Sequence, residues 1–278
     1  MIQNLLIRSA SGAVYALVIM LACFSGELGV LFLASFLSVV AIQEWQQILQ
    51  PNQSKSSLPN MISVGLMLTV LWSRSQIINA APTTRASFDL IMVVFITILV
   101  VWQVFNARMT KPIGLYHNFF GLFYVGFPMY LLLKTSFFYG IYEPWILASI
   151  FILIWTLDSF AYLTGVFFGK TPFFPKISPK KTWEGFGGGA VFTFIAAGVL
   201  GLCIPVFPLW CWMGLALVIV FSATVGDLFE SGIKRAFHIK DSGNFMPGHG
   251  GILDRIDSLL FALPMAYFYL KMLEKLYV

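Results

Sequence analysis

The sequence predicts an all-α fold, that of a polytopic integral membrane protein with about nine transmembrane helices. Of the 278 residues, 59% are hydrophobic and only 10% are charged, and the mean hydropathy is +0.85. A soluble domain normally carries about 25% charged residues, so this composition is typical of a chain that lies mostly within a bilayer. No long stretch has an ordinary polar composition, and a separate soluble domain is therefore not expected.

The individual helices follow from the distribution of apolar residues. A transmembrane helix needs about 17–25 predominantly apolar residues. Nine segments meet this requirement, at residues 9–25, 28–46, 60–80, 87–106, 114–134, 144–168, 186–205, 207–227 and 253–273. The chain contains no evident internal repeat, which distinguishes it from transporters built from repeated halves.

The loops between these segments carry an uneven distribution of basic residues. With nine spans the loops alternate between the two sides of the membrane. One side carries nearly all of the loop Lys and Arg, including those of the segments 169–185 and 230–255. Positively charged loops face the cytoplasm. We therefore expect both of these polar segments on the cytoplasmic side.

Asp158 lies inside the apolar sequence ASIFILIWTLDSFAYLTGVFF. A carboxylate in the middle of a span costs at least about 2.5–3.5 kcal/mol on insertion scales, so such residues usually face a polar cavity or a partner. We favour a functional role for Asp158. The alternative is a structural pair or a protonated, hydrogen-bonded acid.

Asp227 closes the eighth apolar segment and begins a polar group on one helix face. Glu230 and Ser231 follow it at i+3 and i+4, and Lys234 at i+7 stays near that face. Taken alone, this group is explained by a helix end with local salt bridges at the membrane surface.

A glycine-rich loop containing Gly248, Gly250 and Gly251 precedes the last apolar segment. Glycines allow positive φ and close backbone approach, and exposed amides in such a loop can hold anionic oxygens. Asp254 and Asp257 then project from one side of the first helical turn. With Asp227 they would form a hard-oxygen site suited to Mg²⁺, which is typically held by one or two carboxylates plus substrate phosphates. The alternative is capping, because acidic residues suit a helix N-terminus.

The segment 169–185, GKTPFFPKISPKKTWEG, is rich in lysine and proline. Its three prolines make it stiff and non-helical. The lysines could clamp phosphate groups, although the segment is not a P-loop because GxxxxGK[ST] is absent. The alternative is a positive-inside loop that attracts anionic lipid head groups.

The polar elements described above are expected on the same side of the membrane. Three acids suited to a divalent metal, a glycine loop and two basic clusters all map to the cytoplasmic side. This combination indicates metal-assisted phosphoryl or nucleotidyl transfer beside a bilayer. We therefore divide the chain into N-terminal transmembrane helices at 1–140 and a C-terminal transmembrane catalytic region at 141–278, within one integrated membrane domain. The residues alone leave the substrate open between a lipid and a nucleotide.

The second half of the chain also resembles a known family, the phosphatidate cytidylyltransferases or CDP-diacylglycerol synthases. The family signature reads approximately S-x-hydrophobic-K-R-x4-K-D-x-G-x2-L-P-x-H-G-G-x2-D-R-x-D. The sequence SGIKRAFHIKDSGNFMPGHGGILDRID from Ser231 to Asp257 is similar to it in register. The upstream sequences GDLFES, SPKKTWEG and the D-x-x-A-Y-x-x-G-x-x-F-G-K pattern from Asp158 resemble the family too. Met246 stands where the family usually has Leu, and Phe160 where many members have Gly.

The resemblance implies that CTP and phosphatidate react to give CDP-diacylglycerol and pyrophosphate, with Mg²⁺ as cofactor and a second metal ion as a further candidate. It implies Asp227, Asp254 and Asp257 as metal ligands. It implies as catalytic residues Asp227, Asp254, Asp257, Lys234 and Arg255. It implies as substrate-binding residues Asp158, Ser178, Lys180, Lys181, Glu230, Ser231, Arg235, Lys240, Asp241, His249, Gly250 and Gly251. His249 would orient a phosphate or fix the loop, and these two roles stay open.

A lipid substrate further implies a polar funnel that faces the cytoplasm between the helices, with the acyl chains left in the bilayer. We expect a bacterial cytoplasmic (inner) membrane location, membrane lipid and CTP as partners, no nucleic acid, and a homodimer by analogy with the family. A CTP-dependent lipid kinase of the polyprenol type is the alternative enzyme. A lipid transporter without chemistry is the alternative from another class.

Overall fold

The computed structural model describes residues 2–49, 112–138, 140–246 and 250–276. The expected spans at 60–80 and 87–106 lie outside these residues. The described part contains long helices at all seven other expected positions. They are α1 (Ile2–Phe24), α2 (Glu27–Leu49), α5 (Pro112–Thr135), α6 (Pro144–Phe168), α7 (Trp183–Cys203), α8 (Leu209–Ala236) and α9 (Leu253–Leu276).

Five of the described helices are long and apolar enough to cross a membrane, namely α2, α6, α7, α8 and α9. Large apolar side chains such as Phe32, Phe167 and Leu202 are mostly exposed, at 73%, 74% and 83%. Such exposure suits helices whose outer surface contacts lipid instead of water. The helical class and the membrane character of the chain are thus confirmed, while the count of nine spans stays a prediction.

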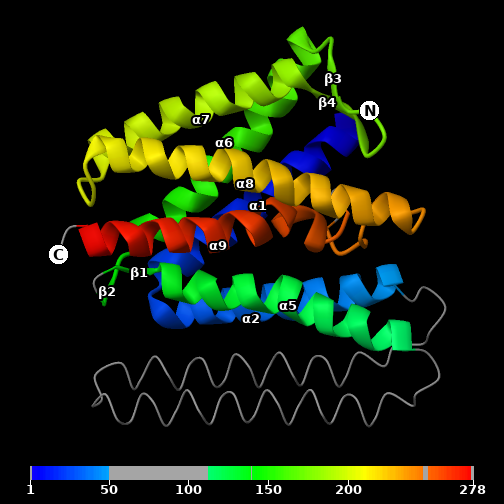
Figure 1. Cartoon of the computed structure of the whole chain (residues 1–278), viewed down its shortest axis with the longest axis horizontal. Helices are drawn as coiled ribbons and strands as arrows, with labels where there is room; N and C mark the ends of the chain where they lie inside the picture. The colour runs from blue at the N-terminus through cyan, green and yellow to red at the C-terminus, as the bar shows by residue number, and fades with distance from the viewer. Residues whose placement is uncertain (1, 50–111, 139, 247–249, 277–278) are drawn as a thin grey trace.

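The helices bring the two polar segments to the same end of the molecule. In Figure 1 the C-terminal end of α8, the loop before α9 and the hairpin between α6 and α7 all lie toward the right. The chain's C-terminus and the β1–β2 hairpin (Phe137–Phe138 and Ile141–Tyr142) lie at the opposite end. The expected grouping of the segments 169–185 and 230–255 is therefore confirmed.

The lysine-rich segment forms an antiparallel hairpin of β3 (Pro172–Phe174) and β4 (Ser178–Thr182), an addition to the all-helical expectation. Prolines bar a helix here but are tolerated at the edges of short strands. The hairpin is anchored by Phe173, whose ring lies 4.3 Å from that of Trp183 and 5.3 Å from that of Phe186. The basic segment is thus held against the start of α7.

Helices α6 and α7 approach closely along small residues. A Cβ atom on Gly189 would lie 2.9 Å from the Cβ of Ala161, and one on Gly185 would lie 2.8 Å from the Ala161 carbonyl oxygen. Small residues at such spacing let helices in membranes pack backbone to backbone. The atypical Phe160 stacks on Phe192 of α7, with ring centroids 3.9 Å apart. Phe160, where many family members have Gly, therefore fits into the contact between α6 and α7.

Helices α8 and α9 also pack closely, and this contact positions the polar residues. A Cβ atom on Gly226 would lie only 2.6 Å from the carbonyl oxygen of Asp257. Only glycine permits this approach. The next residue, Asp227, is consequently held beside the first turns of α9.

Candidate active site

Asp227 forms an ion pair with Lys181 of β4. One carboxylate oxygen of Asp227 contacts the Lys181 ammonium group, and the other accepts a hydrogen bond of 3.3 Å from the Ser231 hydroxyl. The side chains of Lys181 and Asp227 are 32% and 25% exposed, so solvent can reach this pair. Residues 46 positions apart in the sequence therefore meet at the surface of the site.

Lys234 lies deeper and bridges two acids. Its Nζ is 2.7 Å from Oδ1 of Asp254 and 3.2 Å from Oε1 of Glu230. The three side chains are nearly inaccessible, with exposed fractions of 10% for Lys234, 7% for Asp254 and 0% for Glu230. Neither carboxylate oxygen of Glu230 makes a hydrogen bond within the described residues. One cation thus compensates two buried carboxylates.

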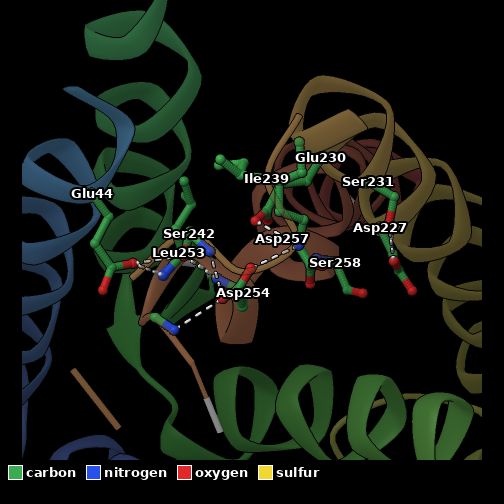
Figure 2. A network of polar contacts seen from close by, with 12 residues as sticks. Glu44, Asp227, Glu230, Ser231, Ile239, Ser242, Leu253, Asp254, Asp257 and Ser258 are labelled. Atoms are coloured by element: carbon green, nitrogen blue, oxygen red, sulfur yellow. Dashed lines mark hydrogen bonds and ion pairs between the residues drawn. The ribbon is translucent and has the colours of Figure 1, made fainter. Parts of the chain in front are cut away.

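The loop before α9 folds around the Asp254 carboxylate (Figure 2). Oδ2 of Asp254 accepts hydrogen bonds of 2.9 Å from the amides of Ser242 and Gly251. The Asp254 amide donates back to the Ser242 hydroxyl over 3.3 Å. Asp254 therefore holds the loop in place, as the capping alternative predicted. The Gly251 amide binds the Asp254 carboxylate and not an anionic ligand.

Gly250 adopts a φ of +85°, in the left-handed region that glycine tolerates. It pairs with Met246, whose amide donates a hydrogen bond of 2.9 Å to the Gly250 carbonyl oxygen. Methionine in place of the usual leucine is mostly buried there, at 9% exposure. His249 lies outside the described residues, and its two expected roles stay predictions.

Glu44 of α2 is a site residue that the sequence reasoning missed. Its Oε1 accepts a hydrogen bond of 2.9 Å from the Ile252 amide, and its Oε2 accepts one of 2.8 Å from the Leu253 amide. Oε2 also accepts one of 2.9 Å from the Ser242 hydroxyl. Figure 2 shows the Glu44 side chain reaching from α2 toward this loop. The signal that singled out Asp158, an acid within an apolar segment, applies to Glu44 as well.

Asp158 and Asp257 complete the acidic group. Asp257 lies within electrostatic range of Glu230, Asp227 and Asp158. Asp158, exposed on α6, lies within electrostatic range of Asp227, Lys181 and Arg255. Carboxylates thus predominate: the acids are Asp158, Asp227, Glu230, Asp254 and Asp257, and the cations that interact with them are Lys181, Lys234 and Arg255.

The other predicted residues lie on the β3–β4 hairpin, at the end of α8 and in the loop between α8 and α9. Arg235 donates hydrogen bonds to the carbonyl oxygens of Ile177 (3.4 Å) and Ile239 (2.9 Å), which connects α8 with the β3–β4 hairpin. Ser178 and Lys180 belong to β4, and Lys180 is exposed. Lys240 and Asp241 are exposed in the loop between α8 and α9.

The donor atoms suit a hard divalent cation, although the described residues contain no group of three or more His, Cys, Asp or Glu side chains arranged as a metal site. The predicted ligands Asp227 and Asp254 are paired with Lys181 and Lys234 instead. The excess of carboxylates over cations, with Glu230 and Asp254 sharing one lysine, nevertheless favours an added positive charge. Mg²⁺ therefore fits this group by chemistry.

The chain is similar to known cytidylyltransferases. The model of the "Cytidylyltransferase family" matches residues 6–273. A phosphatidate cytidylyltransferase of Staphylococcus aureus is 30% identical over 269 residues, which cover 93% of this chain and 96% of that protein. That of Thermotoga maritima is 40% identical over 155 residues, 52% of this chain. That of Bacillus subtilis is 46% identical over 121 residues, 43% of this chain. The last two alignments span 57% and 45% of the relatives' own lengths.

Proposed function

The chain belongs to the cytidylyltransferase family, and from this premise we propose that it is a phosphatidate cytidylyltransferase. It would transfer CMP from CTP to phosphatidate, giving CDP-diacylglycerol and pyrophosphate. The observation that carries the proposal is that the Asp227–Lys181 pair and the buried Lys234–Asp254 pair join β4, the C-terminal part of α8 and the first turn of α9, which lie toward one end of the apolar helices (Figure 1). This position suits a reaction between a soluble nucleotide and a lipid head group.

The transfer needs no nucleophile from the protein. An ionised phosphate oxygen of phosphatidate attacks the α-phosphorus of CTP, a new P–O bond forms, and the bond to the β-phosphate breaks to release pyrophosphate. Both substrates are anionic, so their encounter requires neutralisation of charge. Lys181 is suited to this task because it is partly exposed and can exchange its Asp227 partner for a phosphate. The exposed Lys180, Lys240 and Arg255 would add positive charge around it.

We propose Mg²⁺ as the cofactor, held by Asp227 and Asp257 with Asp254 beside them, and with room for a second ion at the same acids. When bound, the ion would neutralise the phosphates and stabilise the leaving pyrophosphate. Asp227 has one oxygen against Lys181 and one against the Ser231 hydroxyl, and each oxygen keeps a further lone pair. Lys234 meanwhile holds Asp254 in place, and His249, Gly250 and Gly251 belong to the loop that would border the nucleotide.

We further propose nine spans with a polar funnel between them, in a bacterial cytoplasmic membrane and with the site on the cytoplasmic side. The bacterial relatives and the excess of Lys and Arg at the end that carries the site support this arrangement. Asp158, exposed on α6 near Lys181 and Arg255, would line the funnel. A homodimer is part of the same proposal, by analogy with the family.

The product separates this proposal from a lipid kinase. Purified protein with labelled CTP, phosphatidate and Mg²⁺ is expected to release pyrophosphate and to form a CDP-lipid only when phosphatidate is present. A kinase would release CDP and would accept a lipid alcohol such as a polyprenol. Formation of CDP with no pyrophosphate would contradict the proposal, and omission of phosphatidate is the control.

Removal of divalent cations is expected to stop the reaction. In excess EDTA we expect the rate of pyrophosphate release to fall to background, because the triphosphate and the acidic group would repel each other without an added cation. Return of Mg²⁺ in excess over the chelator should restore the rate, which controls for unfolding. Full activity in EDTA would exclude a required metal.

A further inference from the structure

We propose that Glu44, in the N-terminal part of the chain, is a positioning residue of the active site. Its carboxylate would hold the first turn of α9 and the preceding loop, so that Asp254 and Lys234 stay in place relative to Asp227. The kinetic test of this inference rests on the proposed function. The structural role of Glu44 rests on its hydrogen bonds from α2 to the loop.

The backbone amides from Gly251 to Asp254, at the start of α9, all have hydrogen-bond acceptors. The first amides of a helix have no partner within the helix and need an external acceptor. Here the Ile252 and Leu253 amides donate to Glu44, the Gly251 amide donates to Asp254, and the Asp254 amide donates to Ser242. Glu44 therefore supplies two of the four acceptors from a helix about 200 residues away in the sequence.

The Glu44 carboxylate occupies space that two glycines of the loop leave open. A Cβ atom on Gly243 would lie 2.7 Å from its Oε1, and one on Gly251 would lie 2.3 Å from its Oε2. Gly251 belongs to the glycine loop that the sequence predicts to hold anionic oxygens, and Gly243 lies upstream of it in the same motif. In this structure their missing side chains make room for the carboxylate of Glu44.

Glu44 is connected through Ser242 to the ion pair of Asp254 and Lys234. The Ser242 hydroxyl donates to Glu44 and accepts from the Asp254 amide, while the Ser242 amide donates to the Asp254 carboxylate. Asp254 in turn pairs with Lys234. Glu44 is 4% exposed and Ser242 also 4%, so water cannot readily replace these bonds. Loss of the carboxylate would therefore loosen the loop around Asp254.

The test replaces Glu44 by glutamine, which has the same shape but only one acceptor oxygen and an amide group that donates. Glu44→Gln would leave at least one of its three donors facing another donor. We expect kcat of the purified, monodisperse protein to fall about ten- to a hundredfold, as for the loss of a buried hydrogen bond to a charged group. KM for phosphatidate should change by less than about twofold, since the hydrogen bonds of Glu44 to the described residues go to two backbone amides and the Ser242 hydroxyl. Glu44→Asp, which keeps the charge, should recover part of the lost rate.

Two further measurements make the result decisive. The exposed Gln47, one turn along the same helix, provides the matched control, and Gln47→Ala should keep the wild-type rate. Hydrogen–deuterium exchange of the peptide covering residues 242–256 should become faster in Glu44→Gln than in the control. An unchanged kcat, or unchanged exchange of that peptide, would overturn the inference. Absence of CDP-lipid formation by the wild-type protein would instead contradict the proposed function, and the exchange measurement would still decide the role of Glu44.

Discussion

Asp227→Asn is expected to reduce CDP-lipid formation by more than about a hundredfold, the size of loss seen when a charge-stabilising group is removed from an active site. The substitution keeps the shape of the side chain but removes the charge that faces Lys181. An amide is also a poor ligand for Mg²⁺ compared with a carboxylate. The rate of pyrophosphate release from labelled CTP, at saturating phosphatidate, measures the effect.

The control for Asp227→Asn is an acid-to-amide change far from the site. Glu274 lies near the C-terminal end of α9, where it pairs with Lys271 over 2.6 Å. Glu274→Gln should keep the wild-type rate. Because the Asp227 side chain is partly exposed, we expect Asp227→Asn to fold, with a thermal midpoint close to that of the wild type. A near-normal rate in the folded variant would remove Asp227 from the catalytic group.

Lys234→Met is expected to lower the stability of the protein by about 3–5 kcal/mol, since removal of one partner leaves buried charge without compensation. The change deprives both Glu230 and Asp254 of their cation, and the side chains of these acids are 0% and 7% exposed. Unfolding in detergent, followed by the thermal midpoint or by denaturant titration, measures the loss. The variant should also be inactive, because Asp254 would lose its fixed position.

Two comparisons separate this effect from a loss of packing. Lys271→Met removes the cation of a partly exposed pair and should change stability by less than about 1 kcal/mol. Combining Lys234→Met with Glu230→Gln removes one of the two uncompensated charges and should recover part of the lost stability. A Lys234→Met protein as stable as the wild type would contradict the interpretation of this group as a buried ion pair.

The sequence predicted the helices well because their signal is local. Each apolar segment carries its own length and composition, so the described helices coincide with seven of the nine expected positions. Spacing within one helix was equally reliable: Asp227 bonds Ser231 at i+4, and Glu230 pairs with Lys234 at i+4. The hairpin of β3 and β4 was expected only as a non-helical segment, because its pairing depends on contacts of Phe173 with α7.

The partners across the fold could not be predicted in the same way. Lys181 was expected to contact phosphate, and the structure pairs it with Asp227. Asp254 was expected chiefly as a metal ligand. In the structure one of its oxygens pairs with Lys234, and the other accepts hydrogen bonds from two loop amides. Glu44, like Asp158, is an acid within an apolar segment. It stands near the end of its expected span, where a charged side chain is explained by contact with the membrane surface. The distances that distinguish these roles arise only when α2, α8 and α9 pack together.

By itself, the sequence determined that the chain is a helical membrane protein, that its polar segments share one end, and which acids and bases gather there with the exception of Glu44. These properties follow from composition, segment length and residue spacing, which need no knowledge of the fold. The tertiary structure alone decided how the charges are paired and that the glycines of the loop accommodate Glu44. Ion pairs and buried hydrogen bonds form over a few ångströms between residues up to 209 positions apart, and only the packing of the helices sets those distances.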